Sequence, residues 1–467
     1  MKTSILRVIP SSLPPLDPNF KPAVLGNRAF LKAVDASGKS EELLIGLSRN
    51  DGAFSVHRTR IFSKDSPQFG ENFPFVERIL KTLLWQKGGY RICVSGPVEI
   101  ADFLKGVCSP SGARAFDIGM MSRIYEQPFC VEHVDAAAFP AENEKSHPKG
   151  GHLNGCRIGF DAGGSDRKVA AIVDGKAVYS EEVMWNPKGE KDPEYHYRGI
   201  TDALKAAASR MPRVDAIGVS AAGVYINNRV MVASLFRGVP PDLFERRVKN
   251  MFLDIQKEWN NVPIQVCNDG DVTALAGSMT LKTGSVLGIA MGTSEAAGYV
   301  TKDGFLTEWL NELAFVPIDY NPSGPVDEWS GDAGVGSQYF CQTGAIRLAA
   351  AAGVDLGTDK TPAEKLKTIQ GLLEKGDRRV PDIFESLGCY LGYAIAGYAD
   401  LYDIRHILLL GRVTSGEGGN IMTTRARKIL DEEFPSISRN ISLHLPEEES
   451  ERRVGQAIAA ASLPEIR

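Results

Sequence analysis

The sequence predicts an α/β protein in which two similar lobes surround a cleft, preceded by an additional N-terminal α/β region. Apolar runs with the composition of β-strands alternate with alanine-rich stretches that have helical spacing. Two strand pairs joined by short glycine turns, at 157–182 and 286–300, each open such a series. Two hairpin-led α/β units in tandem indicate two lobes with a ligand site between them.

The composition is that of an ordinary globular protein. The chain has 467 residues, of which 43% are hydrophobic and 24% are charged, a length that favours about two to four domains. The net charge of −5 gives no reason to expect a nucleic acid or an anionic membrane as partner. No apolar run of about 18 residues predicts a membrane-spanning helix, and the first residues do not resemble a signal peptide.

The seven cysteines are scattered through the chain, and no two of them form a C-x-x-C pair. Free thiols in such a pattern are typical of the reducing cytoplasm, and we expect a cytoplasmic protein. The pattern also argues against a structural zinc site built from cysteines, so we expect no zinc.

A polar segment at 140–155, crowded with Glu, Lys, His, Pro and Gly, predicts a linker or a long loop. It separates region 1–150 from a first lobe expected at 155–270 and a second at 271–449, with the C-terminal helix at 450–463 packing back on the first lobe. The N-terminal region, whose role stays open, has α/β signals of its own: a hairpin at 43–58, a helix at 75–85, a strand at 90–94 and the start of a helix at 98–104.

Beyond the linker the expected elements follow in a clear order. The first hairpin precedes a helix at 198–210, a strand at 214–219, a helix at 241–258 and a strand at 264–267. A helix at 274–279 then precedes the second hairpin, helices at 338–352, 362–374 and 381–402, a strand at 406–411 and a final helix at 450–462.

The first hairpin carries an aspartate and a glycine turn, Asp161-Ala162-Gly163-Gly164-Ser165. Because glycine has no Cβ, the backbone N–H groups of such a turn can approach phosphate oxygens closely. Asp161 is suited to hold Mg²⁺, usually through water. A Gly-Gly hairpin formed for purely geometric reasons is the alternative, which the turn alone does not exclude.

Polar residues also follow predicted strands, at the strand ends where α/β folds place ligands. The strand at 214–219 leads into Ser220-Ala221-Ala222-Gly223, and the strand at 264–267 leads into Asn268-Asp269 ahead of a helix. An Asn-Asp pair is also a common N-cap and turn pair, which is the alternative explanation. We favour a catalytic role because a second glycine turn, Gly292-Thr293-Ser294, and a glycine-rich loop that begins at Gly411 follow in the sequence.

The order and spacing of these motifs resemble the ROK family of sugar kinases, within the actin-like/hexokinase/Hsp70 ATPase superfamily. The resemblance covers about 157–463 and implies two actin-like, ribonuclease H-like lobes, whereas residues 1–150 are not recognised. In that family a D-x-G-G-T turn contacts phosphate and metal, and an N-D pair at a strand end supplies the base. A G-T-G-x-G-x-G turn contacts phosphates, and a late strand with glycines holds adenosine.

Carried over residue by residue, the resemblance implies Mg²⁺ and ATP held between the two turns, with a small-molecule sugar as the acceptor. Asp161 would hold the metal, and Asp269 would be the general base. The nucleotide would contact Gly163, Gly164, Ser165, Lys168, Gly292, Thr293, Ser294 and Gly411. The sugar would contact Ser220, Gly223, Asn268, Asp269 and Glu312. Glu312 is included because the segment from Asn311 to Phe315 is similar to the family's G-E-x-G-H, whose Glu contacts sugar.

The sequence departs from the family pattern at several places. Glu295 stands in the second turn, where two glycines have become larger residues, and its charge either repels phosphates or points away. Phe315 replaces the family's histidine, and Ala222-Gly223 replaces a P-G. The family's cysteine-rich zinc motif is absent from 331–338, where Gln338 lies closest to the usual sugar-binding Glu.

The leading hypothesis is ATP-dependent phosphorylation of a hexose or a related sugar hydroxyl. Whether the protein forms a homodimer stays open. A non-catalytic sugar or nucleotide sensor on the same fold is the first rival, because the second turn is altered. An ATPase coupled to another reaction, as in the branch that activates 2-hydroxyacyl dehydratases, is disfavoured by the scattered cysteines. No helix-turn-helix precedes the linker, which disfavours the DNA-binding branch of the family.

Weaker sugar-site candidates are 185–187 and 227–229, for which ordinary turns are the favoured alternative.

Overall fold

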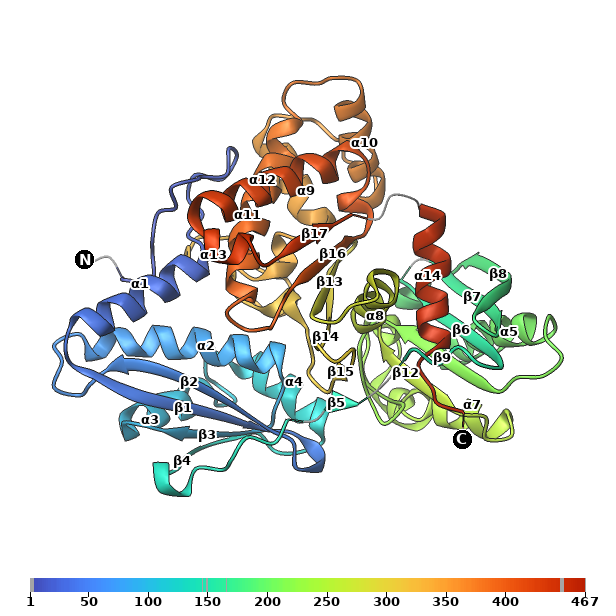
Figure 1. The fold of residues 1–467 in the computed structure, drawn as a ribbon, viewed down its shortest axis with the longest axis horizontal. Coiled ribbons are helices and arrows are strands. Elements are labelled where there is room, and N and C mark those ends of the chain that lie inside the picture. The colour runs from blue at the N-terminus through green and yellow to red at the C-terminus, as the bar shows by residue number, and fades with distance from the viewer. Residues whose placement is uncertain (1–3, 145, 148–149, 165, 446–448, 467) are drawn as a thin grey trace.

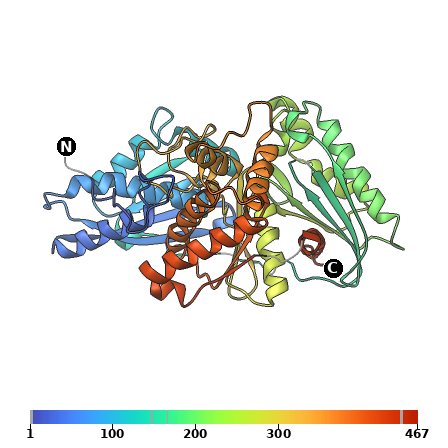
Figure 2. The ribbon, with the colours of Figure 1, turned by 90° about the horizontal axis from the view of Figure 1, so that it is seen from above.

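The structure is a computed structural model that describes residues 4–144, 146–147, 150–164, 166–445 and 449–466 (Figure 1). It is a mixed α/β protein. The described residues form a four-stranded, a five-stranded and a six-stranded sheet and a two-stranded ribbon. Seen from above, the N-terminal region and the first lobe lie at opposite ends of the molecule, with the second lobe between them (Figure 2).

The N-terminal region is built on the four-stranded sheet, in the order β2-β1-β3-β4. The predicted hairpin, helix, strand and second helix are all confirmed, whereas α1, α4 and β4 were not predicted. The elements are α1 (Ala23–Ala36), β1 (Ser40–Ser48), β2 (Phe54–Phe62), α2 (Asn72–Gln86), β3 (Arg91–Ser95), α3 (Val98–Val107), α4 (Ala115–Tyr125) and β4 (Cys130–His133).

The first lobe is built on the five-stranded sheet, in the order β12-β9-β6-β7-β8. Its strands are β6 (Cys156–Ala162), β7 (Asp166–Val173), β8 (Lys176–Met184), β9 (Ala216–Ala221) and β12 (Ile264–Asn268), with the ribbon β10 (Val224–Ile226) and β11 (Arg229–Val232) and the helix α5 (Pro193–Ala208). Because β6, β9 and β12 run parallel, their carboxyl ends meet at one edge of the sheet.

The single helix predicted at 241–258 is interrupted. The chain forms a short α6 (Pro241–Leu243), a π-helical turn (Phe244–Val248) and then α7 (Met251–Glu258). The backbone N–H of Lys249 donates to the carbonyl of Phe244, and the carbonyl of Lys249 accepts from Val230 of β11. Since that carbonyl is used by the ribbon, a regular α-helix cannot continue through it.

The second lobe is built on the six-stranded sheet, in the order β17-β16-β13-β14-β15-β5. Its strands are β5 (Ser146–His147), β13 (Val286–Met291), β14 (Glu295–Val300), β15 (Leu306–Thr307), β16 (His406–Leu410) and β17 (Ser442–His444). Its helices are α8 (Asp269–Leu281), α9 (Gln342–Ala351), α10 (Pro362–Glu374), α11 (Pro381–Tyr398), α12 (Glu417–Glu433) and α13 (Pro435–Ser438). Strand β5 lies within the segment predicted as a linker, so this segment also extends the second sheet.

The C-terminal helix α14 (Glu449–Ala461) lies against β6, β7 and β9 of the first lobe (Figure 1). Two strand glycines allow this close approach. A Cβ at Gly218 would lie 1.6 Å from the carbonyl oxygen of Ala460, and one at Gly159 would lie 1.9 Å from that of Ala457. Any side chain at either position must push the helix away from the sheet.

We therefore expect Gly218→Ala to lower the free energy of unfolding by about 3 kcal/mol, because the extra methyl overlaps backbone that cannot rotate away. Urea denaturation gives the number. Gly371→Ala is the matched control, since Gly371 lies within α10 with open space around its Cα. That variant should be neutral or more stable by about 1 kcal/mol. Equal effects of the two substitutions would contradict the close packing of α14.

One hydrophobic core is shared by the N-terminal region and the second lobe, and it includes Phe20, Trp85, Phe315 and Tyr390. The rings of Phe20 and Tyr390, for example, lie 4.8 Å apart. The first lobe has a core of its own. The N-terminal region is therefore built onto the second lobe. In the described part of the chain, no helix has the length and apolarity needed to cross a bilayer.

Candidate functional site

A cavity of about 990 Å³ opens where the two lobes and the N-terminal region meet. Most of the residues predicted from the motifs line it, although they come from distant parts of the chain. They are Gly164, Gly223, Asn268, Asp269, Gly292, Thr293, Ser294, Glu312 and Gly411. The cavity lining does not include Asp161, Gly163, Lys168 and Ser220, and Ser165 lies outside the described residues.

Asp161 is buried at the carboxyl end of β6, directly opposite Ser220 of β9. The Ser220 hydroxyl donates to Oδ1 of Asp161 at 2.7 Å, and Lys168 Nζ lies 3.8 Å from Oδ2. Burial raises the pKa of Asp161, and the charge of Lys168 and the Ser220 hydrogen bond oppose this shift. Lys168 also pairs with Asp166 at 3.0 Å. The predicted metal residue therefore has a fixed position and a lysine beside it.

The glycine turn after Asp161 is supported by two side chains that follow β8. The indole nitrogen of Trp185 donates to the carbonyl of Gly163 at 2.8 Å. Lys188 lies over the turn, because a Cβ at Gly164 would be 3.3 Å from its ammonium. Sequence analysis missed Lys188, since a lysine in a Pro-Lys-Gly turn carries no signal that it faces a distant site. It adds a positive charge where phosphate binding was predicted.

Asn268 and Asp269 mark the point where β12 ends and α8 begins. Asn268 caps α8: its Oδ1 accepts from Gly270 N at 2.7 Å, and its Nδ2 donates to the carbonyl of Gly223 at 2.8 Å. The N-cap explanation is thus correct for Asn268, while the next residue faces the cavity. Burial raises the pKa of Asp269 to about 6, and the charge of Asp161 adds to this, whereas Lys188 opposes it.

Close contact of α8 with the second hairpin brings the two lobes' motifs together. A Cβ at Gly270 would lie 2.1 Å from the carbonyl oxygen of Ala297, and one at Gly298 would lie 2.2 Å from that of Gly270. Because neither residue has a side chain, the start of α8 rests directly on β14. Asp269 therefore faces the same cavity as the turn that joins β13 to β14.

The second turn and the late glycine lie side by side. In the turn, Gly292 N donates to the carbonyl of Ser294, and a Cβ at Gly292 would have no neighbour closer than 3.9 Å. A Cβ at Gly411 would lie 2.2 Å from the carbonyl oxygen of Met291, the residue before the turn. This follows from the parallel pairing of β13 with β16, which places both strand ends at one edge.

Glu295 does not carry its charge toward solvent. Its carboxylate lies against Gly336, its side chain is 3% exposed, and neither oxygen has a hydrogen-bond partner of good geometry among the described residues. Burial raises the pKa of Glu295 to about 8, and the nearby Glu312 carboxylate adds to the shift. Burial likewise raises the pKa of Glu312 to about 8, helped by Asp269 and Asp271. A neutral Glu295 at pH 7 would not repel phosphates.

We expect Glu295→Gln to change how stability depends on pH. The folded protein holds a proton on Glu295 up to about pH 8, whereas the unfolded chain releases it near pH 4.5. Stability therefore falls as pH rises between these values, by up to about 1.4 kcal/mol per pH unit, and the variant escapes this loss. Urea denaturation should show the stability of Glu295→Gln, relative to the wild type, rising from pH 5 to pH 8 and then levelling off.

The control is Glu417→Gln, which changes an exposed carboxylate at the start of α12. A pH-independent difference between Glu295→Gln and the wild type would show that Glu295 is charged throughout this range.

The fold of this chain is similar to that of several solved structures. No family model matches the sequence, and neither does any curated protein. Among solved structures, a ROK family glucokinase from Streptomyces griseus, determined with glucose and AMPPNP, is similar with a TM-score of 0.52 and 21% identity, over 66% of this chain and 99% of that one. The chain has the fold of a ROK sugar kinase.

Other solved structures with the ROK fold give the same result. A ROK hexokinase from Thermus thermophilus matches with a TM-score of 0.50 and 17% identity, over 65% of this chain and 97% of that one. A ROK family transcriptional regulator, a homologue of the E. coli MLC protein, matches equally well, with 17% identity over 67% of this chain and 79% of that one. The ROK fold thus serves kinases and regulators, and the likeness alone does not separate them.

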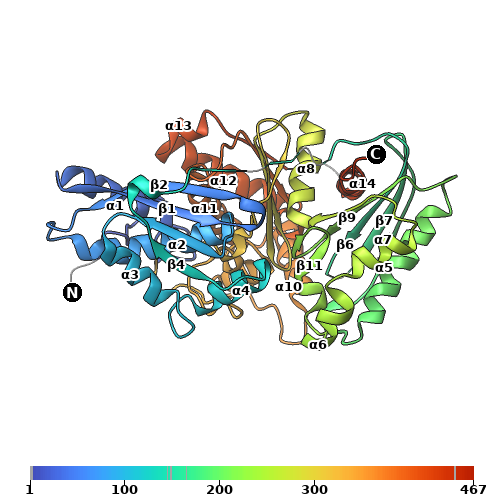
Figure 3. The ribbon, with the colours of Figure 1, turned by 90° about the horizontal axis from the view of Figure 1, so that it is seen from below.

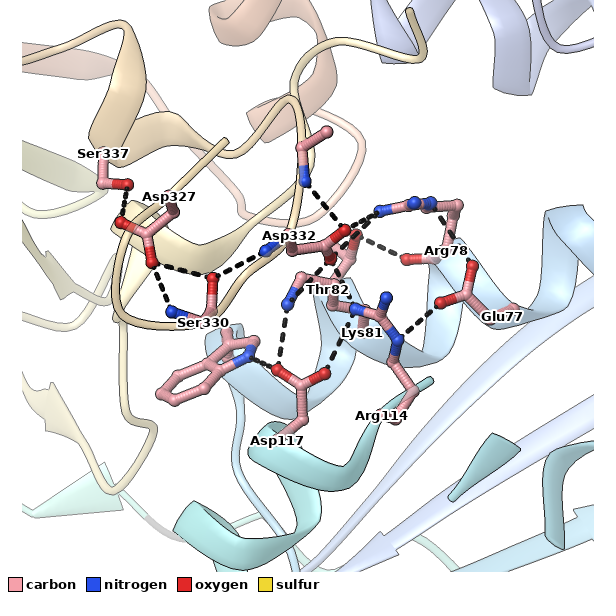
Figure 4. Close-up of polar contacts among 12 residues, drawn as sticks. Glu77, Arg78, Lys81, Thr82, Arg114, Asp117, Asp327, Ser330, Asp332 and Ser337 are labelled. Carbon is pink, nitrogen blue, oxygen red and sulfur yellow. Dashed lines mark hydrogen bonds and ion pairs between the residues drawn. The ribbon is translucent and has the colours of Figure 1, made fainter. Parts of the chain in front are cut away.

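In this ROK fold, the loop that corresponds to the family's zinc motif is held by a buried cluster of charges (Figure 4). Asp332 of this loop pairs with Lys81 at 3.2 Å, with Arg78 at 3.2 Å and with Arg114. Lys81 in turn pairs with Asp117 at 2.9 Å. Burial would raise the pKa of Asp332, but the Arg114 hydrogen bond and the neighbouring cations hold it well below its usual range. All of these cations come from the N-terminal region.

The same loop supplies an acidic residue that sequence analysis missed. Asp327 is buried and lines the cavity, and its carboxylate accepts hydrogen bonds from Ser330 and Ser337 at 2.8 and 2.9 Å (Figure 4). Gln338, the residue nearest to the family's sugar-binding Glu, donates to Asp327 at 3.4 Å. Asp327 lies outside the matched motifs, so only the folded loop reveals it.

Helix α4 brings the N-terminal region to the cavity wall, beside β11 of the first lobe (Figure 3). Met120, Arg123 and Ile124 of α4 line the cavity, together with Trp85 of α2. The Arg123 guanidinium lies 5.0 Å over the ring of Phe244 in the first lobe. The sequence did not predict this wall, because the resemblance to the ROK family does not include the N-terminal region.

The weaker candidates at 185–187 and 227–229 have structural contacts. Trp185 supports the Gly163 turn, as described above. Asn228 turns the ribbon, donates to the carbonyl of Ile264 at 2.8 Å and accepts from Val266 N at 2.8 Å. Arg229 pairs at 2.7 Å with Glu126, the residue that follows α4.

Proposed function

We propose that the protein transfers the γ-phosphoryl group of ATP to a hydroxyl of a hexose or a related sugar. The observation that carries this proposal is Asp269, a carboxylate with a raised pKa that faces a cavity bounded by two glycine turns. Such a cavity offers backbone N–H groups for phosphates and a proton acceptor for a hydroxyl.

In the proposed reaction the sugar hydroxyl oxygen attacks the γ-phosphorus, and a new P–O bond forms. Asp269 accepts the proton of that hydroxyl, because its carboxylate lines the cavity between the two glycine turns. The bond between the γ-phosphorus and the bridging oxygen breaks, and ADP leaves. Glu312 and Asp327 would hold other hydroxyls of the sugar, since both line the cavity.

The residues also fit the phosphates and the metal that this reaction needs. Open space faces Gly292, and the Lys188 ammonium lies over Gly164, so anionic oxygens have room beside one turn and a cation beside the other. Asp161 offers the hard oxygen donors that Mg²⁺ prefers. When bound, Mg²⁺ neutralises charge on the phosphate oxygens. The seven free thiols agree with a cytoplasmic location.

Release of ADP from ATP and Mg²⁺, measured against a panel of hexoses, hexosamines and polyols, tests the proposal. At least one sugar should give turnover well above the rate without sugar. If none does, the kinase proposal fails. Sugar-independent ADP release would instead support the coupled ATPase.

A non-catalytic sugar sensor is the second candidate, because Ser294 and Ala296 replace two glycines of the second turn and a ROK regulator shares the fold. A thermal shift with sugar, in the absence of any turnover, would favour it.

We expect Lys188→Met to lower kcat by about 10², because it removes a cation from the predicted phosphate site. Steady-state kinetics with ATP as the varied substrate measures this effect. Lys191→Met is the matched control, as Lys191 is exposed on the same loop and does not line the cavity. Similar rates for both variants would show that Lys188 has no part in phosphate binding.

A further inference from the structure

Trp329 stands out as a large apolar side chain that is 47% exposed, although it lies on the cavity. Two aromatic neighbours hold its indole from behind. Phe315 and Phe116 lie 5.6 and 5.8 Å from it, centroid to centroid, and both approach at steep angles. The exposed part of the indole is therefore available to a ligand in the cavity.

The loop that carries Trp329 is fixed in place. Within it, Asp327 N donates to the carbonyl of Asp332, and Gly331 N donates to the carbonyl of Asp327. The Asp327 carboxylate accepts from the N–H and the hydroxyl of Ser330. Asp332 is anchored by three cations of the N-terminal region (Figure 4). Because these contacts within the protein hold the loop without a ligand, Trp329 is suited to act as a preformed contact.

The walls of the cavity outside the glycine turns are largely apolar. From the N-terminal region come Met120 and Ile124 of α4, and from the first lobe come Val239 and Phe244. The match to the S. griseus glucokinase covers 99% of that kinase but only 66% of this chain. About a third of this chain therefore has no counterpart there. Since the kinase-like motifs fall in 157–463, this third corresponds to the N-terminal region, and the wall that it builds is an addition to the fold.

We propose that this wall and Trp329 form a second sugar subsite, so that the acceptor is a disaccharide or a longer glycoside. The apolar C–H face of a pyranose packs on an indole, while its hydroxyls need polar groups around the ring. The wall offers both. Arg123 lies over Phe244, and Glu245 is the next residue in the chain. Arg123 and Glu245 both line the cavity. Arg237 of the first lobe also lines the cavity, so the wall carries charges of both signs. Such a wall suits a ligand rich in hydroxyls better than an amine or an acyl chain.

This inference rests on the proposed kinase function, in which Asp269 activates a hydroxyl of the first ring. The second ring would extend from that ring to Trp329. Asp327, which accepts from Ser337 and belongs to the same loop as Trp329, lies on the same cavity. Its carboxylate would accept hydrogen bonds from hydroxyl groups of either ring.

Isothermal titration without nucleotide tests the subsite independently of catalysis. The probes are maltose, cellobiose, lactose, gentiobiose and diacetylchitobiose, each compared with its own monosaccharides. At least one disaccharide should bind about tenfold more tightly than its component sugars. Trp329→Ala should remove this advantage and leave monosaccharide binding unchanged within about twofold, and Trp329→Phe should retain part of it.

Val326→Ala is the matched control, because Val326 is 56% exposed on the same loop and does not line the cavity. Three results would overturn the subsite: no disaccharide that binds better than its monosaccharides, an equal loss of both in Trp329→Ala, or an effect of Trp329 on the KM for ATP alone. Disaccharide binding without ADP release would contradict the kinase proposal and leave the subsite in place. Circular dichroism of both Trp329 variants verifies folding.

Discussion

Replacing Asp269 by Asn is expected to lower kcat by about 10²–10⁴, with a far smaller effect on sugar affinity. Asn keeps the size of the side chain and its hydrogen bonds to hydroxyl groups, but it cannot accept the proton that the attacking oxygen must lose. The buried environment that raises the pKa of Asp269 to about 6 also favours this role, because a base of that pKa is both deprotonated at pH 7.5 and able to take a proton.

Steady-state rates and isothermal titration on the same preparation separate the two effects. Asp303→Asn is the control, since Asp303 is exposed in the turn between β14 and β15. The variant should also be at least as stable as the wild type at pH 8, because it removes a charge that is held against burial and against Asp161. Full turnover by Asp269→Asn would show that another group is the base. If the variant still binds sugar in the titration, it is folded, and a loss of folding cannot explain its loss of turnover.

Short sequence motifs predicted those parts of the candidate site that are formed by residues close together in the sequence. The Asp161 turn, the Asn268-Asp269 strand end and the Gly292 turn each follow a strand directly, so their positions depend on a few neighbouring residues. Their meeting in one cavity follows from parallel strand ends, which is a general property of α/β sheets. This is why most of the predicted residues line the cavity.

The residues that were missed depend on contacts across long stretches of chain. Lys188 reaches the cavity from a turn that has no distinguishing pattern. Asp327 and Trp329 lie in an irregular loop whose shape is set by cations about 200 or more positions away in sequence. Interrupted helices, such as the one at 241–258, are missed for the same reason, since the ribbon that takes up the Lys249 carbonyl is itself distant.

The departures from the ROK pattern are physically connected. Phe315, which replaces a histidine, packs on Trp85 of the N-terminal region at 4.2 Å. The loop without cysteines is held by Asp332, which pairs with the same region. Glu295 lies against Gly336 of that loop. The changes therefore concern one surface, where the N-terminal region packs on the second lobe.

The Asp332 cluster should consequently be the most sensitive point of the molecule to a charge change. We expect Asp332→Asn to lower the free energy of unfolding by about 3–5 kcal/mol, because Lys81, Arg78 and Arg114 keep their charges but lose a shared partner in a buried place. The Lys81 side chain is 0% exposed, so water cannot replace the lost contact. Since the same loop carries Asp327 and Trp329, the KM for sugar should rise in the fraction that stays folded.

Urea denaturation of Asp332→Asn, Lys81→Met and the double variant measures this effect. The sum of the two single costs should exceed the cost of the double variant by about 1–3 kcal/mol, since the second change removes one of the cations that lost Asp332 as a partner. As a control, Asp65→Asn breaks the exposed Lys39–Asp65 pair and should leave the free energy of unfolding nearly unchanged.

The depressed pKa of Asp332 adds a pH signature. The contribution of Asp332 to stability is complete above the unfolded pKa near 3.8 and is lost as the pH falls below it. The deficit of Asp332→Asn should therefore shrink between about pH 4 and pH 2, and a deficit that stays constant would assign the cost to packing rather than to charge.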